Sequence, residues 1–151
     1  QVTFEHAAHF IGNRAFGLGQ WGGEGSCGGA VSIGQRGRVE FKELASFEDN
    51  WSGRGGALCN RGSAEFFRRS FFNGNTASGV VLVCVSSGGD GGAIYTEKGS
   101  KTAFTRKSTM LTNLAGRSGG AVYNAGMLRF STSADFHGNR ASVRLSVQLG
   151  A

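Results

Sequence analysis

Two carboxylates at matching positions are the residues best suited to acid/base chemistry. Glu40 and Glu65 each stand directly before a phenylalanine, so both should point outward from neighbouring turns of the chain. Paired carboxylates can act as acid and base on a glycosidic bond, but such sites also need further acidic or basic groups on the same face. The equivalent positions farther along hold Ala103 and Arg129, and no third acid joins the pair. We therefore expect a surface pair and no catalytic residue.

The other side chains that could take part in catalysis or metal binding form no site either. Arg38 and Lys42 flank Glu40 and are expected to act as ordinary surface counter-charges. His6, His9 and His137 lack the spacing of metal ligands, and solvated strand faces are the better interpretation. The sequence thus predicts a protein that is not an enzyme and has no metal and no cofactor. A polysaccharide lyase or hydrolase remains the lesser alternative, because many parallel β-helices have these activities.

A repeat positions all of these residues. Five times, a phenylalanine is followed six residues later by Phe or Met and nine residues later by Asn, with a small residue two positions beyond. The predicted core stack comprises Phe4, Phe41, Phe66, Phe104 and Phe130 together with Phe10, Phe47, Phe72, Met110 and Phe136. The predicted structural ladder comprises Asn13, Asn50, Asn75, Asn113 and Asn139. Such self-similarity indicates a solenoid, in which each coil buries its apolar face only by stacking on its neighbours.

The spacing indicates which solenoid this is. The anchoring phenylalanines at 4, 41, 66, 104 and 130 are 37, 25, 38 and 26 residues apart, and the short steps suit one turn of a parallel β-helix. Apolar residues two apart, as in Val39 and Phe41, have the alternation of a strand with one buried face, whereas helical periodicity is missing. Gly-Gly-Ala precedes four units, and paired glycines suit a corner that needs positive φ or close backbone approach. Asn also tolerates the left-handed region.

The repeats divide one domain, residues 1–151, into coils and insertions. Repeat units are expected near 1–15, 28–52, 55–77, 91–115 and 119–142, with insertions at 16–27 and 78–90 and a strictly alternating C-terminal strand at 143–149. Both insertions follow an Asn corner, so they should neighbour each other on one flank, where repeat proteins usually bind. The second contains the run Val80–Val85, which is too short to span a membrane and is interpreted as one strand, buried against the coil or offered to a partner.

Three cysteines cannot all pair within one chain. Cys27 and Cys84 lie in or beside the two equivalent insertions, so a disulfide between them is conceivable. Cys59 stands where other coils have Ser32 or Tyr95, and no Cys-x-x-Cys spacing suggests zinc or redox chemistry. We expect three small buried thiols, with the Cys27–Cys84 bridge as the alternative.

The Gly-Gly-Ala-Ile and Phe-x-x-Asn elements together resemble the repeats of the chlamydial polymorphic outer membrane protein (Pmp) family. The resemblance covers nearly the whole chain, from Phe4 to about Ser142. It implies an all-β, right-handed parallel β-helix of the pectin-lyase-like kind, often on a secreted or surface protein that adheres or binds. It also implies that the repeated residues are structural.

The positive net charge of the chain favours an acidic partner. Sixteen Lys and Arg against ten Asp and Glu give a net charge of +6. The partner could be an acidic protein assembly, an acidic glycan or an anionic membrane. A nucleic acid is not expected, because the core claims Phe66 and Phe72 and leaves only Phe67 and Phe71 for base stacking. The partner-binding candidates are Trp21, Val81, Val83, Arg36, Arg38, Arg68 and Arg69.

Two classes of function follow. The first is a docking or linker module that holds acidic proteins in a larger assembly, as basic linkers of algal light-harvesting antennae do in a plastid. The second is an extracellular, adhesin-like repeat that binds a host or a glycan. The chain begins with Gln1, so we expect a mature form or a segment of something longer.

Overall fold

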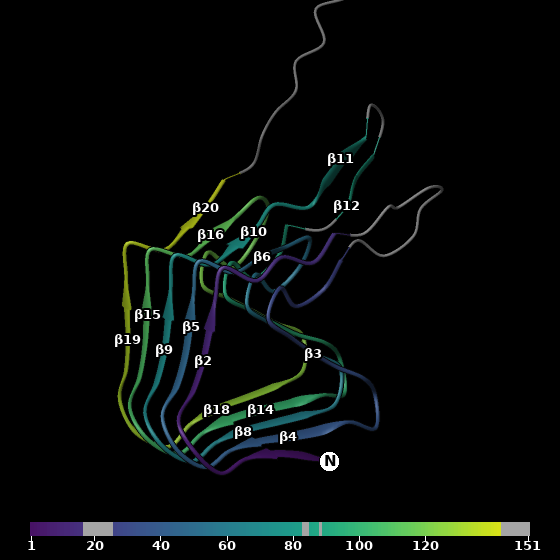
Figure 1. Ribbon diagram of the computed structural model, residues 1–151. Helices are drawn as coiled ribbons and strands as arrows, with labels where there is room; N and C mark the ends of the chain where they lie inside the picture. The colour runs from purple at the N-terminus through teal and green to yellow at the C-terminus, as the bar shows by residue number, and fades with distance from the viewer. Residues whose placement is uncertain (17–25, 83–84, 88, 143–151) are drawn as a thin grey trace, which may run out of the picture.

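The computed structural model describes residues 1–16, 26–82, 85–87 and 89–142, and among these the side chains of 80–82 and 85–87 are not described. This part of the chain contains twenty short strands and no helix. Nearly all of them pair in parallel with strands one coil away, which makes an all-β parallel β-helix (Figure 1). The predicted fold class is confirmed. No helix in the described residues is long and apolar enough to cross a membrane.

Each full coil contributes one strand to each of four parallel sheets, in the order Gly-Gly sheet, first Phe sheet, second Phe sheet and Asn sheet. The Gly-Gly sheet contains β3 (Val31–Ile33), β7 (Leu58–Asn60), β13 (Ile94–Thr96) and β17 (Val122–Asn124). The first Phe sheet contains β1 (Val2–Phe4), β4 (Arg38–Phe41), β8 (Ser63–Phe66), β14 (Lys101–Phe104) and β18 (Met127–Phe130).

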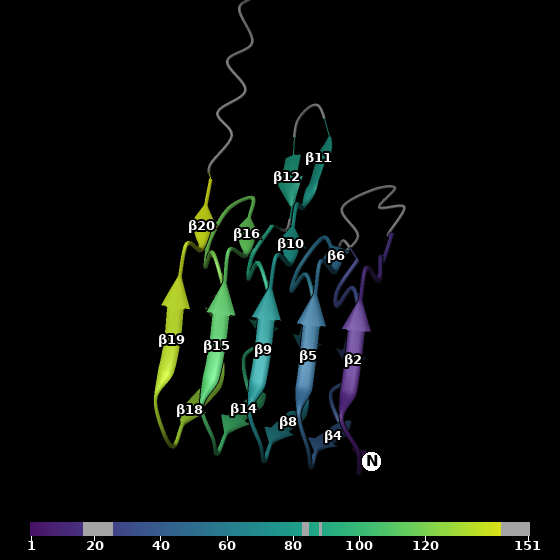
Figure 2. The same ribbon diagram turned by 60° about the vertical axis from the view of Figure 1, so that its left-hand side comes forward.

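The second Phe sheet shows the stacking of the coils most clearly, because its strands stand side by side in chain order (Figure 2). It contains β2 (Ala8–Ile11), β5 (Ala45–Glu48), β9 (Ser70–Asn73), β15 (Ser108–Leu111) and β19 (Ala134–His137). The short Asn sheet contains β6 (Trp51–Ser52), β10 (Thr76–Ala77), β16 (Leu114–Ala115) and β20 (Arg140–Ala141).

Two columns of mainly aromatic side chains form the largest part of the core, and apolar residues of the Gly-Gly strands such as Leu58 and Ile94 pack with them. Phe4, Phe41, Phe66, Phe104 and Phe130 form the first column, with neighbouring ring centroids 4.6–5.0 Å apart and nearly parallel planes. The second column meets the first edge to face, as between Phe41 and Phe47 at 5.6 Å. Met110 takes the fourth place in the second column and is fully buried. Phe136, which ends this column, is 51% exposed because its strand has a neighbour on one side only in the described sheet.

The paired glycines meet two separate requirements. The first glycine of each pair has positive φ, as at Gly55 with φ 55°. A Cβ on the second glycine would collide with neighbouring backbone, as at Gly56 against Gly92 in the next coil and Thr76 near the end of its own coil. At the Asn corners the expectation is wrong in one detail. The left-handed residue is the one before the Asn, for example Asp49 with φ 52°, so the Asn itself is free to bond along the stack.

The second insertion departs from the predicted single strand. β11 (Val80–Leu82) and β12 (Val85–Ser87) pair antiparallel, so the apolar run turns back on itself in a hairpin. This hairpin projects away from the coil beyond the Asn sheet (Figures 1 and 2). The predicted C-terminal strand at 143–149 and the middle of the first insertion lie outside the described residues.

Candidate binding surfaces

The Asn ladder runs along one corner of the coil. Asn75 illustrates its bonding: Nδ2 donates to Oδ1 of Asn113 at 3.0 Å and to the carbonyl oxygen of Phe47 at 2.9 Å. Its Oδ1 accepts from the backbone N–H and from Nδ2 of Asn50. The same pattern links Asn13 to Asn50 and Asn113 to Asn139. An interior Asn therefore uses both amide hydrogens and both lone pairs, so the ladder is structural and offers nothing to a ligand.

Glu40 and Glu65 lie opposite each other on β4 and β8, but they do not form a free surface pair. Glu40 is only 6% exposed, contrary to the expectation of a surface pair. Its two oxygens lie 2.7 Å from Arg38 and 2.7 Å from Lys42, and these cations cover it. Glu65 lies 3.3 Å from Arg38 and 3.7 Å from Lys101. Arg38 and Lys42 thus serve as counter-charges, as predicted.

The surroundings of Glu40 favour its ionised form. The hydrogen bond from Lys42, followed by the charges of Lys42 and Arg38, lowers the pKa of Glu40 despite the opposing effect of burial. A general acid would need the opposite shift, so that it keeps its proton near neutral pH. Within the described ranges, no group of three His, Cys, Asp or Glu side chains could hold a metal ion.

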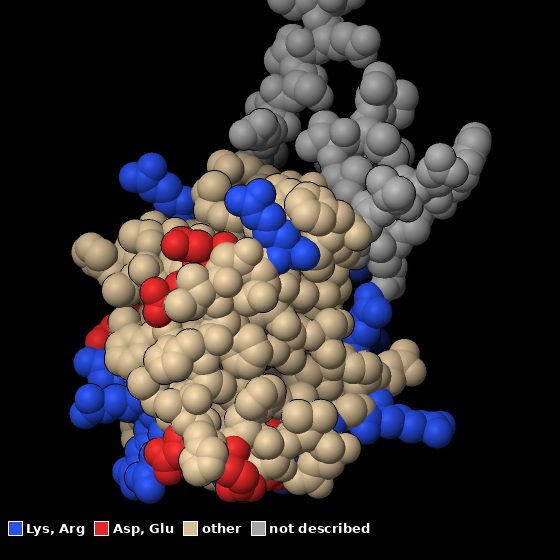
Figure 3. All heavy atoms as spheres, in the orientation of Figure 1, with Lys and Arg blue, Asp and Glu red and all other residues tan. Residues whose placement is uncertain are grey.

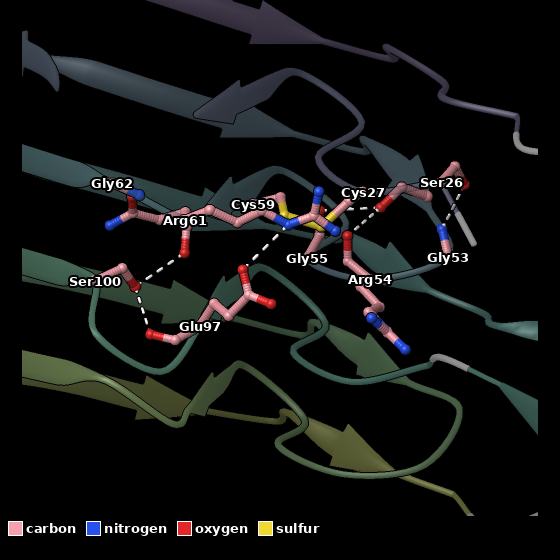
Figure 4. The surroundings of a disulfide bond; sticks show 12 residues. Ser26, Cys27, Gly53, Arg54, Gly55, Cys59, Arg61, Gly62, Glu97 and Ser100 are labelled. Carbon is pink, nitrogen blue, oxygen red and sulfur yellow. Dashed lines mark hydrogen bonds and ion pairs between the residues drawn. A yellow bond between two sulfur atoms is a disulfide. The ribbon is translucent and has the colours of Figure 1, made fainter. Parts of the chain in front are cut away.

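A disulfide joins Cys27 to Cys59, with Cα atoms 5.3 Å apart (Figure 4). The expectation of three buried thiols is wrong, and so is the pairing considered for Cys27; Cys84 lies outside the described residues. Cys27 precedes Gly28 at the corner where the first insertion rejoins the coil. The outward position of Cys59 on β7 lies one coil further along, within reach of that corner. The sequence alignment of the repeats placed Cys59 correctly opposite Ser32 and Tyr95 but gave no sign that Cys27 comes so near.

The described ends of the two insertions meet at Gly53. Its N–H donates to Oγ of Ser26 at 2.8 Å, at the end of the first insertion. Its carbonyl oxygen accepts from the N–H groups of Gly79 at 3.2 Å and Gly89 at 2.6 Å, at the two ends of the second. Both insertions therefore leave from one flank of the coil, which agrees with the sequence-based prediction for their bases.

The second insertion is also held by an ion pair. Asp90 is 1% exposed, and Arg117 donates to it from Nε at 2.9 Å and from a terminal nitrogen. This hydrogen bond raises the pKa of Arg117. Nearby, the Tyr95 and Tyr123 rings stack at 5.3 Å, and burial raises the pKa of Tyr95. The Arg54 guanidinium lies 5.6 Å from the centroid of the Tyr95 ring.

Those partner-binding candidates that the structure describes do not gather in one place. Trp21 and Val83 lie outside the described residues, and Val81 lies on β11. Arg36 is exposed on the turn before β4, whereas Arg38 is committed to Glu40 and Glu65.

Only Arg68 and Arg69 lie in a common hollow, at the corner between the two Phe sheets. Arg106 and Lys107 join them there and were missing from the candidates, although they follow Phe104 by two and three residues just as Arg68 and Arg69 follow Phe66. The register of the turns brings these two residues alongside.

A buried polar cluster was missed entirely. Asn60 is fully buried on β7, and its Nδ2 donates to the carbonyl oxygen of Lys101 at 2.7 Å and to Oγ1 of Thr102 at 2.9 Å. Thr96 and Thr102 share a hydrogen bond of 3.0 Å. The sequence did contain a sign of this cluster, because polar residues recur at the last position of successive Gly-Gly strands. Asn60, Thr96 and Asn124 share this position and lie in one column. The cluster fastens one corner of the coil, and its members Asn60, Thr96 and Thr102 are fully buried.

The comparison with known families concerns the third and fourth coils. Residues 69–97, which run from the turn before β9 to the end of β13, match the Chlamydia polymorphic membrane protein (Chlamydia_PMP) repeat. This segment is a Pmp-type repeat. It contains Phe72, Asn75 and the pair Gly91-Gly92, and the structure pairs each with its counterparts in adjacent coils. No curated protein and no solved structure matches the chain significantly.

Proposed function

We propose that this chain is a non-enzymatic β-helical binding module of a secreted or surface-exposed protein, similar in role to an adhesin repeat. The observation that carries the proposal is the Cys27–Cys59 disulfide in a chain with a Pmp-type repeat. Disulfides persist in oxidising compartments such as the periplasm and the cell exterior, whereas cytosolic thiols are kept reduced. A repeat of a surface-protein family and a bond of an oxidising compartment support the same location.

The bonding of the acidic groups supports a module without catalysis. The carboxylates of Glu40 and Glu65 are each shared between two cations, which leaves neither as an available base with a partner acid. Parallel β-helices that cleave polysaccharides need clustered carboxylates on one face. Purified protein is therefore expected to leave pectate intact, with and without calcium. Cleavage that vanishes in Glu65→Gln would contradict this part of the proposal.

The alternative is a linker that docks on acidic proteins inside an assembly. The net charge of +6 suits it equally well, but an assembly in a reducing compartment would keep Cys27 and Cys59 as thiols. No observation favours an algal antenna in particular. An experiment that determines the location of the protein in the cell therefore distinguishes the two functions, whereas the charge of the partner does not.

The test is made on protein isolated from its native cells with thiols blocked at lysis. Peptide mapping without reductant should find Cys27 linked to Cys59, and protease added to intact cells should remove the protein. The internal linker would instead give two alkylated thiols and a chain that resists protease until the cells are opened. Either of those results would reject the proposed function.

A further inference from the structure

We propose that the hollow at the corner between the two Phe sheets binds a sulfated polysaccharide. We call this hollow the basic groove. Its volume is about 550 Å³, and it is lined by Glu43, Leu44, Arg68, Arg69, Arg106, Lys107, Thr132 and Ser133. The inference rests on the proposed function, because sulfated glycans belong to cell surfaces and matrices.

The register of the coils builds the groove. The turns that lead from the first to the second Phe sheet hold one another by backbone hydrogen bonds. Ser70 N–H donates to the Lys107 carbonyl at 3.3 Å, and Ser108 N–H donates to the Ser133 carbonyl at 3.3 Å. Arg69 and Lys107 stand directly before the paired residues Ser70 and Ser108, so they lie beside each other on adjacent coils. Arg68 and Arg106, one position earlier, lie beside each other in the same way. The two coils thus carry a basic pair each, about 4.8 Å apart at the backbone.

The groove keeps an excess of positive charge. Lys107 lies 2.6 Å from Asp135, and Arg68 lies 3.8 Å from Glu43, with more than half of the Arg68 side chain exposed. Neither Arg69 nor Arg106 has an ion-pair partner in the part of the chain that the structure describes. Lys and Arg side chains are visible along this corner at the lower left of Figure 3, with acidic side chains beside them. Two guanidinium groups are therefore free to bind an added anion.

The lining favours a glycan over an acidic protein. Leu44 is its only large apolar residue, whereas a specific protein interface buries about 800 Å² per partner around an apolar and aromatic centre. The guanidinium fork bonds tetrahedral oxyanions with two parallel hydrogen bonds, which suits sulfate groups. Thr132 and Ser133 at the end of the groove supply hydroxyl groups for sugar hydroxyls. A linear chain with repeated sulfate groups can engage the basic pairs of the two adjacent coils at the same time.

The experiment measures binding of the folded chain to immobilised heparin in about 0.15 M salt, where isolated surface charges are screened. The double variant Arg69→Ser/Arg106→Ser should bind about tenfold more weakly, which corresponds to about 1.4 kcal/mol. The matched control is Arg36→Ser/Arg129→Ser, which removes the same charge from exposed positions outside the groove. It should bind within about twofold of the unmodified chain. All four side chains are exposed, so the variants should melt together with the parent.

Competition with other polyanions tests whether the groove recognises sulfate groups. Desulfated heparin and polygalacturonate should compete poorly, since they offer no sulfate, and poly-glutamate should also compete poorly. Equal losses in both double variants, or no binding of heparin at this salt concentration, would overturn the inference. Stronger competition by poly-glutamate would mean that the groove takes an acidic protein instead. Failure here leaves the disulfide and surface-exposure test untouched, so the two proposals fail separately.

Discussion

Cys27 and Asp90 occupy equivalent positions, each directly before the Gly-Gly pair at which an insertion rejoins the coil, and each is bonded to the coil beyond. Cys27 is linked to Cys59 covalently, whereas Asp90 accepts a hydrogen bond of 2.9 Å from Nε of Arg117. The same mechanical requirement, to fasten the end of a long loop, is thus met once by a disulfide and once by a buried ion pair. The two fastenings should respond to different conditions, the first to reductant and the second to loss of charge.

Removal of the disulfide should destabilise the fold. We expect Cys27→Ser to lower the free energy of unfolding by about 3–4 kcal/mol, because the bond closes a loop of 32 residues in the unfolded chain. Urea unfolding with and without reductant provides the measurement. The parent should lose stability in reductant, and the variant should not. Cys84→Ser is the control and should remain sensitive to reductant; insensitivity in that variant would show that the wrong cysteines had been paired.

Loss of one ladder residue should be costly. Asn75→Ala removes four hydrogen bonds and takes the acceptor from the backbone N–H and Nδ2 of Asn50, and the donor from the Phe47 carbonyl, in a buried corner. Asn113 Oδ1 keeps only its bond from the Asn75 backbone N–H. We expect a loss of roughly 2–4 kcal/mol in the free energy of unfolding. Asn73→Ala is the matched control, because Asn73 is exposed on the same coil and accepts only from Thr112. Equal losses in the two variants would mean that the amide column adds no stability of its own.

The second glycine of a pair should tolerate no side chain. Gly56→Ala would place a Cβ against the backbone of Gly92 and Thr76, and neither can move without separating two coils. We expect a loss of at least about 3 kcal/mol or a failure to fold, as for severe overpacking. Gly34→Ala, where a Cβ meets nothing within 4 Å, should change the melting temperature little. A well-folded Gly56→Ala protein, seen by circular dichroism and melting, would refute the close stacking at this corner.

The charges around Glu40 should make stability depend on pH. Lys42 and Arg38 lower the pKa of Glu40 in the folded state from its ordinary value of 4.5. Folding therefore favours the ionised form, and this contribution is present above the unfolded pKa and is lost as pH falls through the folded pKa. Between about pH 6 and pH 3 the parent should lose more unfolding free energy than Glu40→Gln. The exposed Glu5→Gln variant should follow the parent, and parallel curves for all three would dismiss the effect.

Much of the architecture could be predicted, because it depends on local repetition. The phases of Phe41, Phe66 and Phe104 determine the stacking register, and the structure pairs them as that spacing requires. The Cys27–Cys59 bond could not be predicted in the same way, because it joins residues from different columns whose proximity depends on how the corners bend in three dimensions. For the basic groove, the repeat phase aligns Arg68 with Arg106 and Arg69 with Lys107, but it does not show that their turns enclose a hollow. The hairpin in the second insertion was missed because an apolar run shows where strands are favoured but not where a strand turns back.

The Asn ladder also gives the molecule a direction. The side-chain bonds between ladder residues all run one way, since each Nδ2 from Asn13 to Asn113 donates to Oδ1 of the ladder Asn in the next coil. Among the described residues, the column ends at one side with the Oδ1 acceptor of Asn13 and at the other with the second Nδ2 hydrogen of Asn139. Two copies joined by a twofold axis at like ends would place acceptor against acceptor or donor against donor. Any added coil that continues the column, from this chain or another, must therefore join head to tail, and growth of the column is polar.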